Sequence, residues 1–231
     1  MIYIIDNLMM PEERQKCVNS INYRCGRKPL IEISSMIPKS IYFTNAPMEF
    51  SNSYIDSLDI QFVGDNSLRD FSGYKYALRN AVMKSFDDII LCNSSCPPQA
   101  LKAIIDRDDV QAGAIVSPGM KSFYRYDGFK FRIAPHLQSY CLRIYGRNLI
   151  LRVLEYVEHV EDIFKQLSFN DDSQFKEYLI RHCEVGLSSF TKAYGRNLFL
   201  SMDGSLVDLN CLTTAHKLFF FDSRRKDNRF V

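Results

Sequence analysis

The chain has 231 residues, of which 46% are hydrophobic and 24% are charged, and its formal net charge is +2. This composition is typical of a globular domain with a sizeable core, and the balanced charge excludes broad electrostatic binding of nucleic acid. The apolar start of the chain meets an acid at Asp6, unlike a signal peptide, and no run reaches the roughly 20 apolar residues of a membrane-spanning helix. The seven cysteines are scattered, unlike those of a small disulfide scaffold. We therefore expect a cytoplasmic protein with reduced thiols, in which any membrane contact is peripheral.

Strand and helix patterns alternate through the first half of the chain. Short apolar or alternating runs that end in turn residues predict strands at 30–34, 40–45, 59–66, 88–92 and 110–118. Helical spacing of apolar residues and helix-start signals predict helices at 11–23, 73–86 and 97–107. This alternation predicts an α/β fold with a mostly parallel central sheet flanked by helices.

Helices dominate the second half. Residues 119–132 are aromatic and basic, which is typical of a hairpin or of a loop over a site. Beyond them the patterns predict two strands, at 139–146 and 196–202, and two helices, at 147–167 and 173–195. Because no repeat or low-complexity linker interrupts the chain, we expect residues 1–231 to form a single domain.

A polar cluster follows the predicted strand at 88–92. Asn93, Ser94 and Ser95 stand where this buried strand leaves the sheet, and in α/β folds that edge is often the working face. The local alternative is a helix cap, since Asn and Ser are favoured caps and a predicted helix begins at 97. The sequence leaves both interpretations open.

Four stretches that lie far apart in the chain carry a family resemblance: RDFSGYKYAL (69–78), LCNSSCPP (91–98), PHLQSYCLRIYGRNLI (135–150) and CEVGLSSFTKAYGRNLFL (183–200). Together they resemble the rhamnan synthesis F-like glycosyltransferases, which use nucleotide sugars to build bacterial cell-surface polysaccharides. The HLQSY motif is the most distinctive of the four. The resemblance implies a single GT-A domain, Rossmann-like in fold, in which residues 1–118 bind the nucleotide sugar and residues 119–231 form the acceptor side and the tail.

The resemblance also implies a reaction and its partners. The enzyme would transfer a sugar from a nucleoside-diphosphate donor, for which the family suggests dTDP-rhamnose, to a hydroxyl of a lipid-linked polysaccharide or O-antigen intermediate. The displacement would be direct and inverting, at the inner face of the membrane. Two other classes stay open. One is an inactive glycosyltransferase-like assembly partner. The other is a nucleotidyltransferase, although the stretch IDNLMMPEER is not the Gly-rich basic loop that such enzymes usually show.

Glu184 is the residue to which the resemblance gives the catalytic role. In related enzymes an acid pair opens a helix in an EDxxL-type pattern, to which residues 183–187 are similar. Glu184 matches the acid that serves as general base, whereas Cys183 replaces the first acid. The alternative is an ordinary helix acid, but the neighbouring residues are mostly apolar, which argues against a solvated helix face.

The remaining site residues form two groups by the resemblance. The donor would be lined by Asp70, Tyr74, Asn93, Ser94 and Ser95, and the sugar or acceptor would lie near His136 and Gln138. Local alternatives exist for both groups. Asp70 could cap the helix at 73–86, and His136 could be a structural hydrogen-bonding residue.

The loop after the strand at 88–92 departs from many GT-A enzymes, in which an Asp-x-Asp motif holds a divalent metal against the diphosphate. Mg²⁺ and Mn²⁺ prefer carboxylate oxygens, whereas Asn93, Ser94 and Ser95 offer neutral groups. We therefore expect the donor to bind without a metal cofactor. The charge of the diphosphate would be met by backbone N–H groups and by cations such as Arg69 or Arg125.

Overall fold

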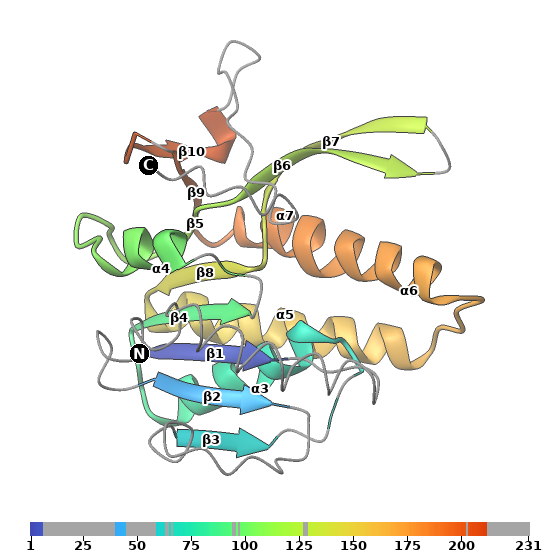
Figure 1. Cartoon of the computed structure of the whole chain (residues 1–231), viewed down its shortest axis with the longest axis horizontal. Coiled ribbons are helices and arrows are strands. Elements are labelled where there is room, and N and C mark those ends of the chain that lie inside the picture. Colours follow the sequence, from blue (N-terminus) through green and yellow to red (C-terminus); the bar gives the residue numbers. More distant parts are fainter. Residues whose placement is uncertain are drawn as a thin grey trace.

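A computed structural model describes the fold over residues 1–6, 40–44, 59–62, 65, 67–93, 96, 98–126, 129–201 and 203–211 (Figure 1). The helix predicted at 11–23 and the strand predicted at 30–34 lie outside these residues. In the part of the chain that the structure describes, no helix has the length and apolar character needed to cross a membrane.

A mixed sheet forms the central layer of the described chain. Its eight strands follow the order β10-β9-β5-β8-β4-β1-β2-β3 (Figure 1). Their bounds are β1 (Ile2–Asp6), β2 (Ser40–Thr44), β3 (Asp59–Phe62), β4 (Asp88–Asn93), β5 (Ala114–Ser117), β8 (Cys141–Tyr145), β9 (Arg196–Leu200) and β10 (Leu206–Asp208). The side chains of β4 alternate between the two faces, with Ile89 and Leu91 in one core and Ile90 and Cys92 in the other. A strand that is buried on both faces reads as a continuous apolar run, which is the pattern seen at 88–92.

The expectation of a mostly parallel sheet needs correction, because only part of the sheet is parallel. β1, β2, β3 and β4 run parallel to one another, and β5 runs parallel to β9. β8 lies between β4 and β5 and is antiparallel to both, and β10 is antiparallel to β9. The physical reason lies in the connection after β5. A parallel return requires a long crossover, usually a helix, whereas here the chain enters a hairpin and turns back into the sheet as β8.

That hairpin is formed by β6 (Met120–Tyr126) and β7 (Phe129–Leu137), which pair as a separate two-stranded sheet. It extends away from the central sheet in Figure 1. The segment 119–132, for which the sequence left a hairpin or a loop open, is therefore part of a hairpin. β7 delivers the HLQSY motif to the turn that precedes β8.

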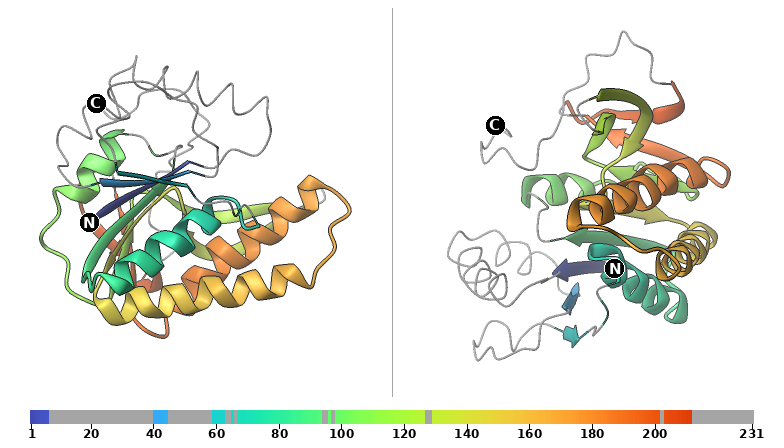
Figure 2. Two further views of the ribbon diagram at one scale, coloured as in Figure 1. Left: turned by 90° about the horizontal axis from the view of Figure 1, so that it is seen from below. Right: turned by 90° about the vertical axis from the view of Figure 1, so that its right-hand side faces the viewer.

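Helices cover both faces of the sheet. One face carries α3 (Asp70–Met83), α5 (Arg147–Lys165), α6 (Asp172–Leu179) and α7 (Leu187–Thr191), and the other face carries α4 (Pro98–Ile105) (Figure 2). Between α6 and α7 lies a π-helix, η2 (Ile180–Gly186). The helix predicted at 173–195 is thus one helical run with a wide turn inside it. A short 3₁₀ helix, η3 (Leu209–Cys211), follows β10.

Candidate functional site

The HLQSY motif meets the stretch that contains Glu184 in space. Ser139, in the turn between β7 and β8, donates a hydrogen bond from its hydroxyl to Glu184 Oε1 at 2.7 Å. The backbone N–H of Leu137 donates to the hydroxyl of Ser188 at 3.0 Å. The HLQSY segment and the CEVGLSS segment, which lie about 45 residues apart along the chain, therefore form one unit.

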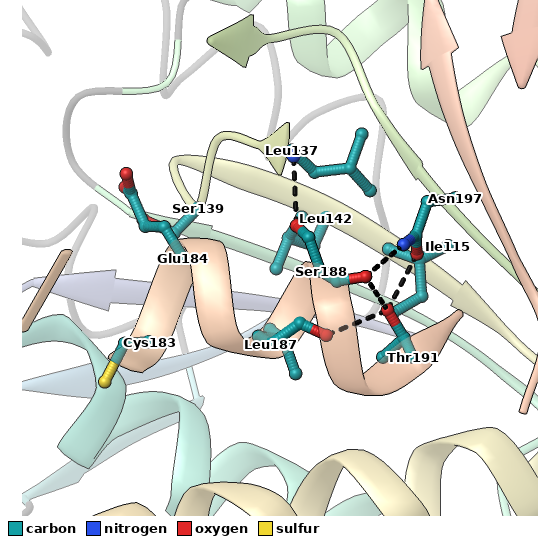
Figure 3. A pocket seen from close by; sticks show the side chains of 10 residues that line it. All are labelled: Ile115, Leu137, Ser139, Leu142, Cys183, Glu184, Leu187, Ser188, Thr191 and Asn197. Carbon is teal, nitrogen blue, oxygen red and sulfur yellow. Dashed lines mark hydrogen bonds between the residues drawn. The ribbon is translucent and has the colours of Figure 1, made fainter. Parts of the chain in front are cut away.

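A pocket lies along this contact. It encloses about 220 Å³ of empty space, part of which is open to solvent. Its polar lining comes from Ser139, Glu184, Ser188, Thr191 and Asn197, and apolar side chains fill the rest of the wall. Figure 3 shows Glu184 and Ser139 at one end of this lining, and Ser188, Thr191 and Asn197 at the other.

Glu184 lies in η2 and is incompletely paired. Its Oε1 accepts the hydrogen bond from Ser139, but its Oε2 is buried and accepts none from the residues that the structure describes. A buried acceptor without a partner costs roughly 1–3 kcal/mol, and more when it is charged, so native structures keep few of them. π-helical turns are themselves uncommon and occur often at functional sites. Both features distinguish Glu184 from an ordinary helix acid.

Cys183, which replaces the first acid of the related pattern, belongs to the core. Its side chain is 1% exposed. Burial raises the pKa of its thiol, and the neighbouring Glu184 adds to that shift. Cys183 is therefore a neutral packing residue, and Glu184 is the acid that remains at this position of the helix.

The opposite end of the pocket is held by a fully paired polar network. Asn197 on β9 donates from Nδ2 to the Ser188 carbonyl at 2.6 Å, and the Thr191 hydroxyl donates to Asn197 Oδ1 at 2.8 Å. All three residues are buried. This network was not predicted from the sequence, although the polar Asn197 among the apolar residues of 196–202 was a usable signal. Because these groups already bind one another, they shape the pocket wall.

Two of the predicted donor-binding residues are in contact. Asn93, at the end of β4, donates from Nδ2 to Asp70 Oδ2 at 2.8 Å. Asp70 is the first residue of α3, and the N-cap position is occupied by Arg69, so the alternative in which Asp70 caps the helix is wrong. Arg69 has a φ of 51°, a strained conformation for a residue with a side chain. Donor binding by Asp70 and Asn93 stays a prediction, and Ser94 and Ser95 lie outside the described residues.

Tyr74 stands four residues after Asp70 on α3 and contacts the turn that carries Ser139. Its side chain is 1% exposed, and its hydroxyl donates to the backbone carbonyl of Ser139. Burial raises the pKa of Tyr74, so the hydroxyl stays protonated and remains a donor. Tyr74 thus fixes the turn that carries Ser139, while its direct contact with a sugar donor stays a prediction.

His136 and Gln138 flank the same turn and are buried, with exposed fractions of 1% and 4%. The backbone N–H of Gln138 donates to the Gly119 carbonyl at 2.8 Å, and its carbonyl accepts from the Ser117 hydroxyl at 3.0 Å. Both residues are close to Ser139 in the sequence and are buried with the same turn. Their role toward a sugar or acceptor stays a prediction.

A metal ion in a protein is held by several ligand atoms that converge on one point. Within the described ranges, no three His, Cys, Asp or Glu side chains gather in a way that could hold a metal ion. At the end of β4 the nearest carboxylate, Asp70, is engaged by the amide of Asn93, whereas hard cations take several oxygen ligands. These residues do not fit the metal centre of a typical GT-A enzyme. Of the two cations named above, Arg69 pairs with Asp172 and lies 5.2 Å from the ring centroid of Phe175, and the side chain of Arg125 is not described.

A scan against protein-family models finds no match to the chain, and a search of curated proteins finds no significantly similar sequence. The fold and the site define a mixed α/β protein in which a partly buried glutamate, with one oxygen hydrogen-bonded and the other buried, lies beside a small pocket. The family resemblance of the four stretches stays a prediction.

Proposed function

We propose that this protein is a glycosyltransferase that transfers a sugar from a nucleoside-diphosphate donor to a hydroxyl of a lipid-linked surface polysaccharide. The proposal combines the resemblance of the four stretches with one structural observation. That observation is Glu184, whose Oε1 is held by Ser139 at 2.7 Å and whose Oε2 is buried without a hydrogen bond from the described residues. An acceptor hydroxyl would supply the missing hydrogen bond to Oε2.

Glu184 would act as the general base of an inverting displacement. The acceptor oxygen attacks the anomeric carbon while the bond from that carbon to the diphosphate oxygen breaks and its electron pair leaves with the diphosphate. The acceptor proton passes to Glu184 Oε2. Ser139 holds the other oxygen and so fixes the orientation of the carboxylate. A general base contributes typically about 10²–10⁴-fold to such a rate.

The size of the pocket supports a site that encloses only the reacting group of the acceptor. The space that it encloses away from solvent is about that of one water-sized group, far less than the roughly 300–1,000 Å³ of pockets that enclose a whole ligand. It would therefore accept the attacking hydroxyl. The nucleotide would lie toward Asp70 and Asn93, and the backbone N–H of Asn93 donates to the carbonyl of Tyr140, the residue after Ser139.

Rhamnose is the sugar that the resemblance favours, and the acceptor would be presented at the inner face of the membrane. The neutral side chains of Asn93, Ser94 and Ser95 favour a donor site in which protein groups stabilise the diphosphate. The inactive assembly partner is the alternative, and it is an outcome of the test below.

The test is a panel of nucleoside-diphosphate sugars in a thermal-unfolding assay, with the corresponding free nucleosides as controls. A ligand that binds only the folded protein adds roughly 2.7 kcal/mol at 100 times its Kd. We expect one donor to stabilise the protein, with equal effect in EDTA, and to yield a product of inverted anomeric configuration by NMR when glycoside acceptors are added. Stabilisation by no nucleotide sugar would contradict the proposal. Binding without transfer to any acceptor would favour the inactive partner.

A further inference from the structure

The helical run from α6 to α7 owes its shape to the wide turn η2. Four of its buried side chains stand four residues apart, and Ser188 beside them is buried as well: Leu179, Cys183, Leu187 and Thr191. In a regular α-helix with 3.6 residues per turn, positions four apart rotate by about 40° at each step, so the last of these would face about 120° away from the first. The wider π-turn takes up this rotation and keeps all four residues toward the core.

A hydroxyl from a neighbouring helix binds inside this turn. Tyr156 on α5 donates from its hydroxyl to the backbone carbonyl of His182 at 2.7 Å. An extra residue in a turn interrupts the regular backbone ladder, and an inserted polar group commonly satisfies the carbonyl that is released. Burial raises the pKa of Tyr156, so the hydroxyl stays a donor at neutral pH.

Gly186 makes room for that hydroxyl. A Cβ atom at this position would lie 2.1 Å from the Tyr156 oxygen and 3.2 Å from the Arg181 carbonyl oxygen. The Tyr156 ring is also held from the side, since it stacks on Phe190 with ring centroids 4.7 Å apart. Tyr156 can therefore move little, and any side chain at Gly186 would have to displace it.

We infer that Tyr156 and Gly186 are positioning residues that hold the wide turn and thereby orient Glu184. Glu184 stands between the two ends of the contact, two residues after His182 and two residues before Gly186. Loss of the turn would rotate Glu184 relative to the residues that follow it and break its hydrogen bond from Ser139. The inference rests on the proposed role of Glu184 as the base, since neither Tyr156 nor Gly186 lines the pocket.

The test uses Tyr156→Phe, which removes the hydroxyl and keeps the stacked ring, with Tyr194→Phe as the matched control. Tyr194 packs on Phe190 at 4.8 Å between ring centroids and is 49% exposed. Tyr156→Phe should lower kcat by about 10²-fold, the loss that follows a misplacement of about 1 Å, and leave donor affinity unchanged. In a Glu184→Gln background the same change should have no further effect on kcat, because a base that is absent cannot be misplaced.

A second measurement does not depend on activity. Amide hydrogen exchange across residues 180–186 should be about tenfold faster in Tyr156→Phe than in the wild type or in Tyr194→Phe, and Gly186→Ala should show the same local change. A lower melting temperature with unchanged kcat per folded molecule would overturn the inference, as would a full effect of Tyr156→Phe in the Glu184→Gln background. If the wild type transfers no sugar, the proposed function fails by itself. Amide hydrogen exchange across residues 180–186 then tests the inference by itself, because an unchanged exchange rate in Tyr156→Phe means that Tyr156 does not hold the turn.

Discussion

Glu161 on α5 and Glu184 on η2 are acids of two helical elements that cover the same face of the sheet, but their partners differ. Glu161 is 8% exposed, and its Oε1 accepts a hydrogen bond from the Lys75 ammonium at 2.6 Å. Lys75 also binds Asp65 at 2.6 Å, and Lys165 lies 3.7 Å from the other oxygen of Glu161. Among the residues that the structure describes, Glu184 has one donor, the neutral hydroxyl of Ser139.

The difference is the one that we expect between a structural carboxylate and the general base that we propose. A buried charge that only joins two helices is stable when cations neutralise it, as Lys75 neutralises Glu161 between α3 and α5. A general base needs a free lone pair and must not be held permanently by a cation. Glu184 meets that requirement among the described residues, and we therefore interpret its missing partner as the place of a substrate hydroxyl.

The largest effect on stability should come from breaking the cluster of Lys75, Asp65 and Glu161, which we call the structural cluster. Lys75→Met leaves Glu161 buried without its main partner, and loss of one member of a buried pair costs about 3–5 kcal/mol. Urea unfolding should show this loss, whereas Lys84→Met, at the exposed C-cap of the same helix, should change stability by less than about 0.5 kcal/mol. If Lys75→Met leaves stability unchanged, the claim that Glu161 is a structural carboxylate is wrong.

Removing the hydroxyl of Ser139 tests the proposed role of Glu184 as the general base. Ser139→Ala deletes the hydrogen bond from the Ser139 hydroxyl to Glu184 but keeps the backbone carbonyl that accepts from Tyr74. A lost hydrogen bond to a charged group is worth about 1.5–3 kcal/mol, so we expect transfer to fall by at least about tenfold through a disoriented base. Steady-state kinetics should show the loss in kcat, with donor affinity retained. A change in donor affinity alone would instead place Ser139 in the donor site.

The smallest effect is the response of the structural cluster to acid. Hydrogen bonds from Lys75 and Ser67 outweigh burial and lower the pKa of Asp65 to about 2, from an ordinary value near 3.8. A depressed folded-state pKa gives stability that is fully present above the unfolded-state value and is lost as the pH falls through the folded-state value. The free energy of unfolding of the wild type should therefore exceed that of Asp65→Asn by about 1 kcal/mol above pH ~4, and this difference should vanish near pH ~2. Unfolding curves of both proteins at several pH values measure it, and a pH-independent difference would contradict the assignment.

The elements with strong local signals were predictable from the sequence. The apolar run at 88–92 became β4 (Asp88–Asn93), and the amphipathic pattern at 147–167 became α5 (Arg147–Lys165). The direction of β8 was not predictable from its own residues, because it depends on whether the preceding 20 or so residues form a crossover or a hairpin. Local sequence patterns indicate where helices and strands form, but the order and direction of the strands depend on how the connections between them fold.

The candidate site was predictable only in outline. The motifs pointed to Glu184, Asp70 and Asn93, because residue types in a resembled pattern can be read from the chain. Ser139 was passed over within the HLQSY motif, since its role depends on a partner 45 residues away. The wide turn was missed because a search at 3.6 residues per turn treats the whole of 173–195 as a regular helix.

The most direct test of the central claim compares Glu184→Gln with Glu161→Gln, measuring melting temperature and sugar transfer on the same preparation of each. Both changes keep the size of the side chain and remove its charge. We predict that Glu184→Gln lowers transfer by about 10²–10⁴-fold and leaves the melting temperature nearly unchanged, whereas Glu161→Gln lowers the melting temperature and keeps transfer per folded molecule. Transfer by Glu184→Gln at close to the wild-type rate would contradict the account, and His136 would then be the next candidate for the base.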